Sequence, residues 1–249
     1  MISKSLQIGF FLVSALPGLL AQVPASGRVY DQNPHAWVSW NGDHAVKGRW
    51  GVHFDAQWRR ENMGLSWQQY QVRPGVNYQW SRHVLLTLGY VYTRTYPYGE
   101  FPARFAIPEH RVYQQALIRQ NAGKVRLQHR LRMEQRFIRY ATAPQPPVTY
   151  QNRFRYLLRA EFPLKKTASS EWYVPVGNEV VIGIAPNYGA RPWDQNRAFV
   201  GIGRSTRRFA VDVAYLNQFL GQRNGRVFEV NHTLMIGITA KVAPWRAQK

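Results

Sequence analysis

Long stretches of the chain alternate between two kinds of residue at every second position, and this pattern constrains the fold most. In residues 124–137 the odd positions are mostly apolar, and the even positions are all Lys, Arg, Gln or Glu. A period of two is typical of a β-strand with two unlike faces, whereas a helix repeats every 3.6 residues. The chain is therefore predicted to be all-β.

Eleven segments are predicted as strands from this alternation and from the turn residues between them. A strand of a globular protein usually has about 5–6 residues, whereas a strand that crosses a membrane needs about 9–11. Many of the segments reach the longer range, which favours a transmembrane barrel over a soluble periplasmic sandwich. The segments are 36–42, 49–60, 66–80, 83–95, 109–120, 123–139, 150–163, 172–183, 196–204, 208–219 and 226–242.

The connections between these segments alternate in length. Tight turns are predicted at 81–82, 121–123 and 205–206, and long connections rich in Pro and Gly at 96–108, 140–149 and 184–195. Outer-membrane barrels alternate short periplasmic turns with long extracellular loops, and aromatic girdles flank their apolar band. Candidate girdle residues near strand ends are Trp37, Trp40, Trp50, Trp58, Trp80, Tyr90, Tyr92, Trp172 and Tyr215.

The fold predicted from these features is a closed antiparallel transmembrane β-barrel. Bacterial single-chain barrels have even strand numbers. We therefore expect 12 strands, with an additional strand within residues 26–35. A barrel of 10 strands is the second choice, and in that case segment 36–42 would not cross the membrane.

Residues 1–25 have the features of a secretory signal peptide. Lys4 precedes an apolar stretch over residues 6–20, which Pro17 interrupts, and small residues follow near Ala21 and Ala25. A membrane anchor would need about 20 apolar residues in a row. We expect one barrel domain over residues 26–249, exported to the outer membrane of a diderm, Gram-negative-type bacterium. The absence of Cys excludes disulfides and thiolate metal sites.

Charge is strongly unbalanced. The chain has 33 Lys and Arg against 13 Asp and Glu, a formal net charge of +20. Because the polar face of such a barrel lines its lumen, segments 109–120, 123–139 and 150–163 place ten cations inward against three acids. The candidate anion-lining residues are Arg111, Arg126, Arg130, Arg132, Arg136, Arg153, Arg155 and Arg159. The candidate acidic partners are Asp55, Glu134, Glu161, Asp212 and Glu229, and Glu179 is expected on the wall opposite the arginines.

Two interpretations of this charge remain open. Arginine ladders select anions in pores, so the lumen would pass or bind small anions. Alternatively, the arginines pair with the acids inside a filled barrel that is structural or adhesive and binds lipid or a partner through its outer loops. Rim arginines are predicted to bind lipopolysaccharide phosphates, with substrate capture as the alternative; they are Arg104, Arg191, Arg223 and Arg226. Because exported proteins rarely meet nucleic acid, we expect no nucleic-acid partner.

The sequence offers little support for catalysis. His53 and Asp55 share one strand face, where an acid can orient an imidazole. No H-E-x-x-H, P-loop or G-x-S-x-G motif is present, and His35, His44 and His110 lack metal-ligand spacing. We expect no enzymatic activity, no metal site and no cofactor.

Several motifs are spread over roughly residues 36–243. They are an early Trp37 strand, Arg59-Arg60-Glu61, Gly89-Tyr90-Val91-Tyr92-Thr93-Arg94, Glu109-His110-Arg111, Arg130-Leu131-Arg132-Met133-Glu134 and Asn152-Arg153-Phe154-Arg155-Tyr156. Together they resemble the pattern of a family of predicted outer-membrane barrels, domain-of-unknown-function family 2490. The resemblance implies an outer-membrane location and brings no catalytic residues.

Overall fold

A computed structural model describes residues 27–140, 147–184, 193–222 and 225–241. The predicted signal peptide lies outside these residues. No helix among them is long and apolar enough to cross a membrane. A single turn of 3-10 helix, η1 (Asn62–Gly64), separates the second and third strands. The strands are β1 (Val29–Lys47), β2 (Trp50–Glu61), β3 (Ser66–Gln79), β4 (Val84–Thr95), β5 (Ile107–Ala122), β6 (Val125–Arg139), β7 (Val148–Lys166), β8 (Ser170–Ile184), β9 (Trp193–Thr206), β10 (Phe209–Gly221) and β11 (Val227–Ala240).

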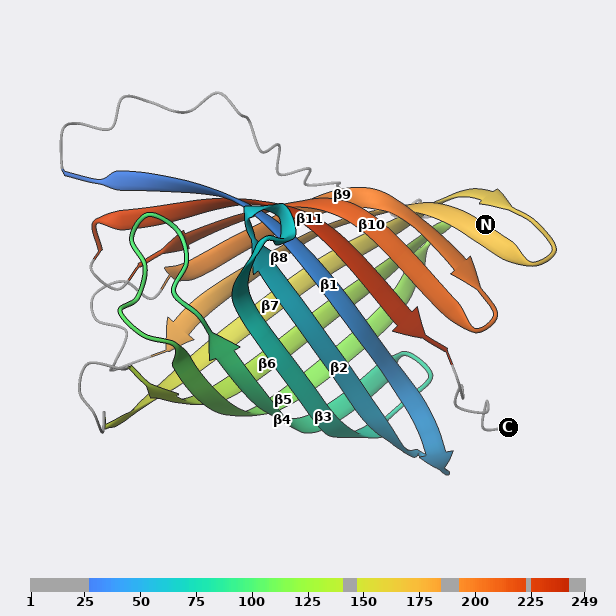
Figure 1. The fold of residues 1–249 in the computed structure, drawn as a ribbon. Coiled ribbons are helices and arrows are strands. Elements are labelled where there is room, and N and C mark those ends of the chain that lie inside the picture. The colour runs from blue at the N-terminus through green and yellow to red at the C-terminus, as the bar shows by residue number, and fades with distance from the viewer. Residues whose placement is uncertain (1–26, 141–146, 185–192, 223–224, 242–249) are drawn as a thin grey trace, which may run out of the picture.

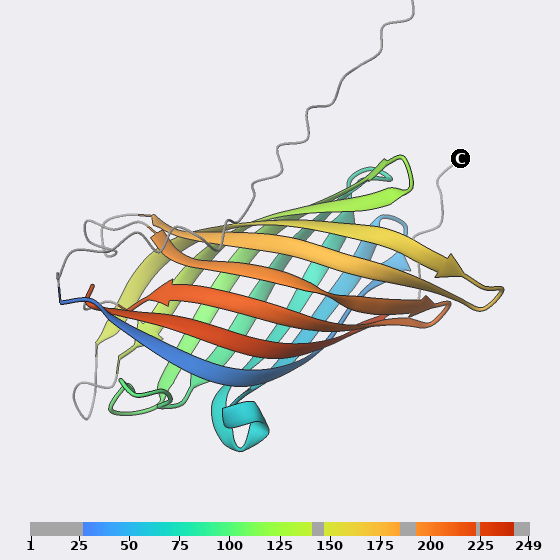
Figure 2. The same cartoon turned by 90° about the horizontal axis from the view of Figure 1, so that it is seen from above.

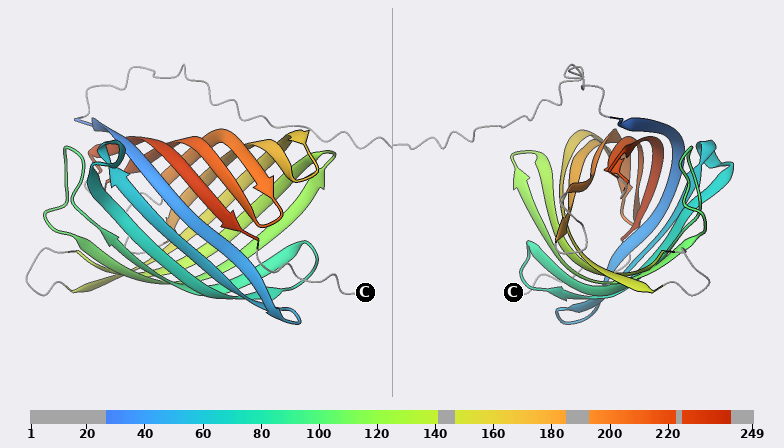
Figure 3. Two further views of the ribbon diagram at one scale, coloured as in Figure 1. Left: turned by 45° about the vertical axis from the view of Figure 1, so that its right-hand side comes forward. Right: turned by 90° about the vertical axis from the view of Figure 1, so that its left-hand side faces the viewer.

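These strands form one closed barrel, which confirms the all-β and closed parts of the prediction. Every strand pairs antiparallel with its neighbour in sequence, and β1 closes the ring by pairing parallel with β11. Figure 1 shows β1 and β11 side by side with their arrowheads pointing the same way, and the right view of Figure 3 looks along the barrel. The barrel is therefore mixed rather than wholly antiparallel.

The described residues contain eleven strands, so the prediction of 12 is wrong. Most of the expected additional strand in 26–35 belongs instead to β1, which has 19 residues. Pro34 lies where β1 pairs with β11 alone, because pairing with β2 starts at His35. Proline is tolerated on such a one-sided edge. An odd number of strands can close this barrel because β1 and β11 pair in parallel. The start of β1 and the end of β11 therefore lie at opposite ends of the barrel.

The two ends of the barrel differ in their connections, and Figure 2 shows both ends. We call the end with short connections the turn end; its connections are 48–49, 80–83, 123–124, 167–169 and 207–208. We call the other the loop end; its connections are 62–65, 96–106, 140–147, 185–192 and 222–226, parts of which lie outside the described residues. The start of β1 lies at the loop end and the end of β11 at the turn end.

The wall of the barrel has apolar side chains outside and polar ones inside. Large exposed hydrophobic residues such as Trp58, Leu88 and Val200 point outward, whereas buried Arg, Glu, Asn and Gln side chains fill much of the interior. Trp37 departs from the predicted girdle because it lies on the inward face of β1. It is 6% exposed and its indole nitrogen donates to Gln68 at 2.8 Å.

Candidate functional site

Opposite charges inside the barrel nearly balance. All thirteen Asp and Glu lie in the described residues, and among them only Glu100 is exposed. The other twelve face the interior or its two mouths. The two cavities and their mouths are lined by Lys241 and by fourteen arginines: Arg28, Arg59, Arg73, Arg111, Arg119, Arg126, Arg130, Arg132, Arg136, Arg153, Arg155, Arg159, Arg197 and Arg226. Most of the positive excess of the chain is therefore carried by residues that do not line these cavities.

The expected local excess on β5, β6 and β7 is offset by acids from the strands that follow. Glu179 does not lie on the opposite wall, because β8 is hydrogen-bonded directly to β7. One oxygen of Glu179 accepts from Arg130 at 2.7 Å, and the other accepts from Arg155 at 2.7 Å and from Arg197 at 3.3 Å. Sequence reasoning missed Arg197 and misplaced Glu179, since both assignments depend on which strands are neighbours.

Glu134 is the centre of the largest cluster. Its carboxylate is fully buried and accepts from Arg153 at 2.6 Å and Arg155 at 3.0 Å. Arg111 and Arg132 have guanidinium nitrogens at 3.7 and 3.8 Å. A buried carboxylate is tolerated where several cations compensate for its lost hydration.

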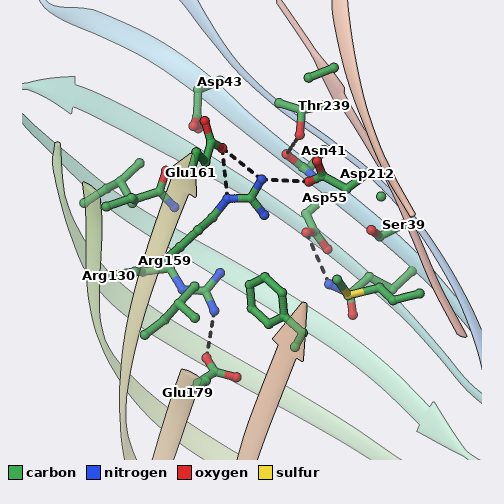
Figure 4. Close-up of a pocket in the computed structure, with 18 of the residues that line it drawn as sticks. Ser39, Asn41, Asp43, Asp55, Arg130, Arg159, Glu161, Glu179, Asp212 and Thr239 are labelled. Atoms are coloured by element: carbon green, nitrogen blue, oxygen red, sulfur yellow. Dashed lines mark hydrogen bonds and ion pairs between the residues drawn. The ribbon is translucent and has the colours of Figure 1, made fainter. Parts of the chain in front are cut away.

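Similar pairs continue toward both ends. Near the turn end, Arg159 donates to Glu161 and to Asp212, both at 2.8 Å, and Figure 4 shows its guanidinium between the two carboxylates. Arg126 pairs with Glu161 and with Glu171. Toward the loop end, Glu109 accepts from both Arg111 and Arg136.

Each of the eight arginines predicted from sequence lines an interior cavity, and each also has a carboxylate within ion-pair distance. Among the predicted acidic partners, Asp55 pairs with Arg73 at 3.4 Å. Glu229 accepts instead from the hydroxyl of Tyr98 at 2.8 Å. His53, which shares a strand face with Asp55, is hydrogen-bonded to Asp43 at 2.7 Å.

Two cavities occupy the interior, of about 580 Å³ toward the turn end and about 1170 Å³ toward the loop end. Three side chains line both of them: Arg59, Arg155 and Arg197. These guanidinium groups therefore lie at the boundary between the cavities.

Arg59 differs from the other inward arginines. It is 8% exposed, yet no carboxylate of the described residues lies within 4.0 Å of it. Its Nη2 donates to Gln57 at 2.8 Å, and its buried Nε has no hydrogen-bond partner in the described part of the chain. Its guanidinium carbon lies 4.1 Å from the ring centroid of Trp37, and that of Arg197 lies 5.4 Å from the same ring.

This arrangement leaves an unneutralised charge in a confined space. A buried guanidinium without a carboxylate is costly unless another anion or water compensates. Two guanidinium groups beside one indole ring offer planar donors suited to an oxyanion. We call Arg59, Arg197 and Trp37 the boundary site. Sequence reasoning missed Arg59 as a site residue, although alternation places it on the same face as Asp55.

The connection 96–106 folds over the loop-end mouth and is held by three carboxylates. The backbone N–H groups of Gly99 and Glu100 donate to Glu61 at 2.8 Å and to Asp31 at 3.3 Å. Tyr98 donates to Glu229, and burial together with that carboxylate raises the pKa of Tyr98 well above its usual range. The described residues contain no cluster of three or more His, Asp or Glu side chains placed to hold a metal.

The model of a family described as a protein of unknown function, DUF2490, matches residues 35–229. No curated protein matches the chain.

Proposed function

Because this chain belongs to the DUF2490 family, which has no assigned function, we propose its role from its own geometry: an outer-membrane β-barrel that binds a small anion at the boundary site. The membrane location is supported by the apolar outer wall, the polar interior and the signal-peptide features of residues 1–25. A soluble protein rarely exposes so many large hydrophobic side chains around its circumference.

The observation that carries anion binding is Arg59. Its charge is buried, lacks a carboxylate in the described residues and borders both cavities. Arg197 lies beside it and contributes a second guanidinium at the same indole ring. An inorganic oxyanion or a small carboxylate would supply the missing negative charge.

We propose binding rather than free passage, because guanidinium side chains occupy the boundary between the cavities. The ion pairs on both sides of this boundary would hold the lining in place. An anion would then enter from one mouth and remain at the centre, where local positive potential raises its concentration.

The test compares two adjacent arginines of β2. Arg59→Gln removes the inward charge, and Arg60→Gln removes an outward one that lies 4.3 Å over the ring of Trp67. Sulfate, phosphate and acetate are titrated calorimetrically into the detergent-purified protein. Because a hydrogen bond to a charged group is worth about 1.5–3 kcal/mol, Arg59→Gln should weaken binding at least about tenfold. Arg60→Gln should leave affinity unchanged. Equal affinity in all three folded proteins contradicts the proposal.

A filled structural or adhesive barrel is the second candidate. It is favoured by the carboxylate partner that each of the eight predicted lining arginines has. Recordings in a planar bilayer under a KCl gradient separate the possibilities. Anion-selective steps would indicate passage. Their absence, together with calorimetric binding that Arg59→Gln abolishes, supports the boundary site, and absence of both favours the filled barrel.

The loop end is also proposed to contact lipopolysaccharide phosphates. Arg104 and Arg226 are exposed there, whereas Arg191 and Arg223 lie outside the described residues. Arg104→Gln with Arg226→Gln should reduce retention of lipopolysaccharide on the purified barrel. Unchanged retention contradicts this contact.

A further inference from the structure

The turn end carries exposed positive charge at each of its five connections. We call these residues the turn-end basic ring. They come in pairs or singly at every hairpin, so they lie around the whole circumference of the closed barrel. The members are Lys47, Arg49, Arg82, Lys124, Lys165, Lys166, Arg207 and Arg208, all of them exposed.

No exposed carboxylate offsets this ring in the described part of the chain. Glu100, the one exposed acid there, lies in the connection 96–106 at the opposite end. The acids nearest the turn end are already engaged inside: Glu161 and Glu171 both accept from Arg126. The potential outside the turn end is therefore strongly positive.

Aromatic side chains follow the ring directly along the strands. Trp50 begins β2 after Arg49, and Phe209 begins β10 after Arg208. Trp80 begins the connection 80–83, which contains Arg82. Trp50, Trp80 and Phe209 are 57%, 63% and 46% exposed. Amphipathic rings of this kind lie at the headgroup level of membranes.

Aliphatic side chains come next toward the middle of the wall. Val52 and Val76 are exposed and are register partners on β2 and β3, and Val213 is exposed on β10. The order from the end inward is therefore cation, aromatic ring, aliphatic chain. This is the order of chemistry across one leaflet, from phosphate through the interface to the acyl chains.

We propose that the turn-end basic ring binds the phosphates of anionic phospholipids in the leaflet that surrounds the turn end. This inference rests on the membrane location in the proposed function and extends it to one leaflet and one lipid class. The turn-end basic ring runs around the circumference and is continuous with the apolar wall. Lipids that surround the barrel would contact such a ring on all sides. A folded protein or a nucleic acid would contact one side of it.

The experiment measures insertion of the full mature chain from urea into vesicles, scored by heat-modifiable gel mobility. Vesicles contain phosphatidylcholine alone or phosphatidylcholine with phosphatidylglycerol. The turn-end variant removes three cations: Lys165→Gln, Lys166→Gln and Arg208→Gln. The matched control removes three exposed cations of the loop end: Arg28→Gln, Arg94→Gln and Arg139→Gln.

Each cation near an anionic surface contributes about fivefold to affinity. We expect phosphatidylglycerol to accelerate insertion of the wild type, and the turn-end variant to lose more than about tenfold of that acceleration. The control should keep it, and added salt should reduce it in the wild type. Equal acceleration in both variants, or none in the wild type, overturns the lipid inference while leaving the membrane location intact. Failure of the wild type to insert into either vesicle overturns both.

Discussion

Arg159 and Asp212 form an ion pair at 2.8 Å although two strands, β8 and β9, lie between theirs. The intervening strands place glycines at the matching positions. Gly177 is the register partner of Arg159 and Gly203 that of Asp212. At Gly203 the missing side chain leaves the space that the carboxylate of Asp212 occupies.

Gly203→Ala should disrupt this contact. A Cβ at this position would lie 2.3 Å from the ring of Tyr173 and 2.5 Å from a carboxylate oxygen of Asp212. Tyr173 itself donates to Asp212 at 2.6 Å, so both partners must move. We expect a loss of about 1–3 kcal/mol in the free energy of unfolding, as overpacking usually costs, measured by urea titration in one detergent.

Gly237→Ala is the matched control, because Gly237 also lies on an inward face and a Cβ there meets nothing closer than 3.5 Å. It should change the unfolding free energy by less than about 0.5 kcal/mol. Equal losses in the two variants would mean that glycine at position 203 serves the backbone and not the ion pair.

Glu134→Gln should be among the most damaging isosteric changes in the barrel. Four guanidinium groups surround this carboxylate, and neutralising it leaves their buried charges in mutual repulsion. Removing one partner of a buried pair typically costs about 3–5 kcal/mol. The urea midpoint should fall accordingly, and sulfate should restore more stability to the variant than to the wild type.

Glu171→Gln provides the comparison for that variant. Its side chain is a quarter exposed and pairs with Arg126 near the turn end, so its loss should cost at most about 1 kcal/mol. If Glu171→Gln proved as damaging as Glu134→Gln, burial of the cluster would not be the source of its stability.

The alternation of polar and apolar residues predicted most of the strands because this pattern depends only on residues within the same strand. The segment expected at 123–139 contains β6 at 125–139, and the one expected at 208–219 overlaps β10 at 209–221. The start of β1 was expected as a separate strand within residues 26–35, but it continues into the segment expected at 36–42. It contains Pro34, and proline normally argues against a strand. Only the pairing of β1 with β11 alone at that position makes it acceptable.

The candidate site was less predictable because it depends on neighbours in space. Alternation indicates that Arg155 and Glu134 face inward, but not that Glu179 from β8 reaches Arg155 at 2.7 Å. Nor could it single out Arg59, which is distinguished by having no carboxylate within ion-pair distance among the described residues, and not by its own sequence pattern. How the interior charges pair depends on which strands are neighbours around the closed barrel.

Tyr98→Phe should loosen the connection 96–106. The variant loses the hydrogen bond to Glu229 and keeps the ring that meets His35 edge-on at 5.6 Å. Because a hydrogen bond to a charged acceptor is worth about 1.5–3 kcal/mol, trypsin should cleave after the exposed Arg104 at least several-fold faster. Cleavage after Arg139, on β6, serves as the internal control. An unchanged rate at Arg104 would show that the backbone contacts to Glu61 and Asp31 suffice.

The same connection should become sensitive to high pH. Burial and the charge of Glu229 raise the pKa of Tyr98 in the folded protein, whereas the pKa of an exposed tyrosine is about 10. Tyr98 therefore loses its proton first in the opened state as pH rises above about 10. By linkage, the closed connection loses stability from that pH upward and not below it.

The measurement is a pH titration of tyrosinate absorbance in the wild type and in Tyr98→Phe. The two curves should differ only at a pH well above the one at which the exposed tyrosines titrate. Glu229→Gln should shift that difference to lower pH, because it removes the repelling charge. A wild-type difference that develops together with the exposed tyrosines would contradict the burial of Tyr98 against Glu229.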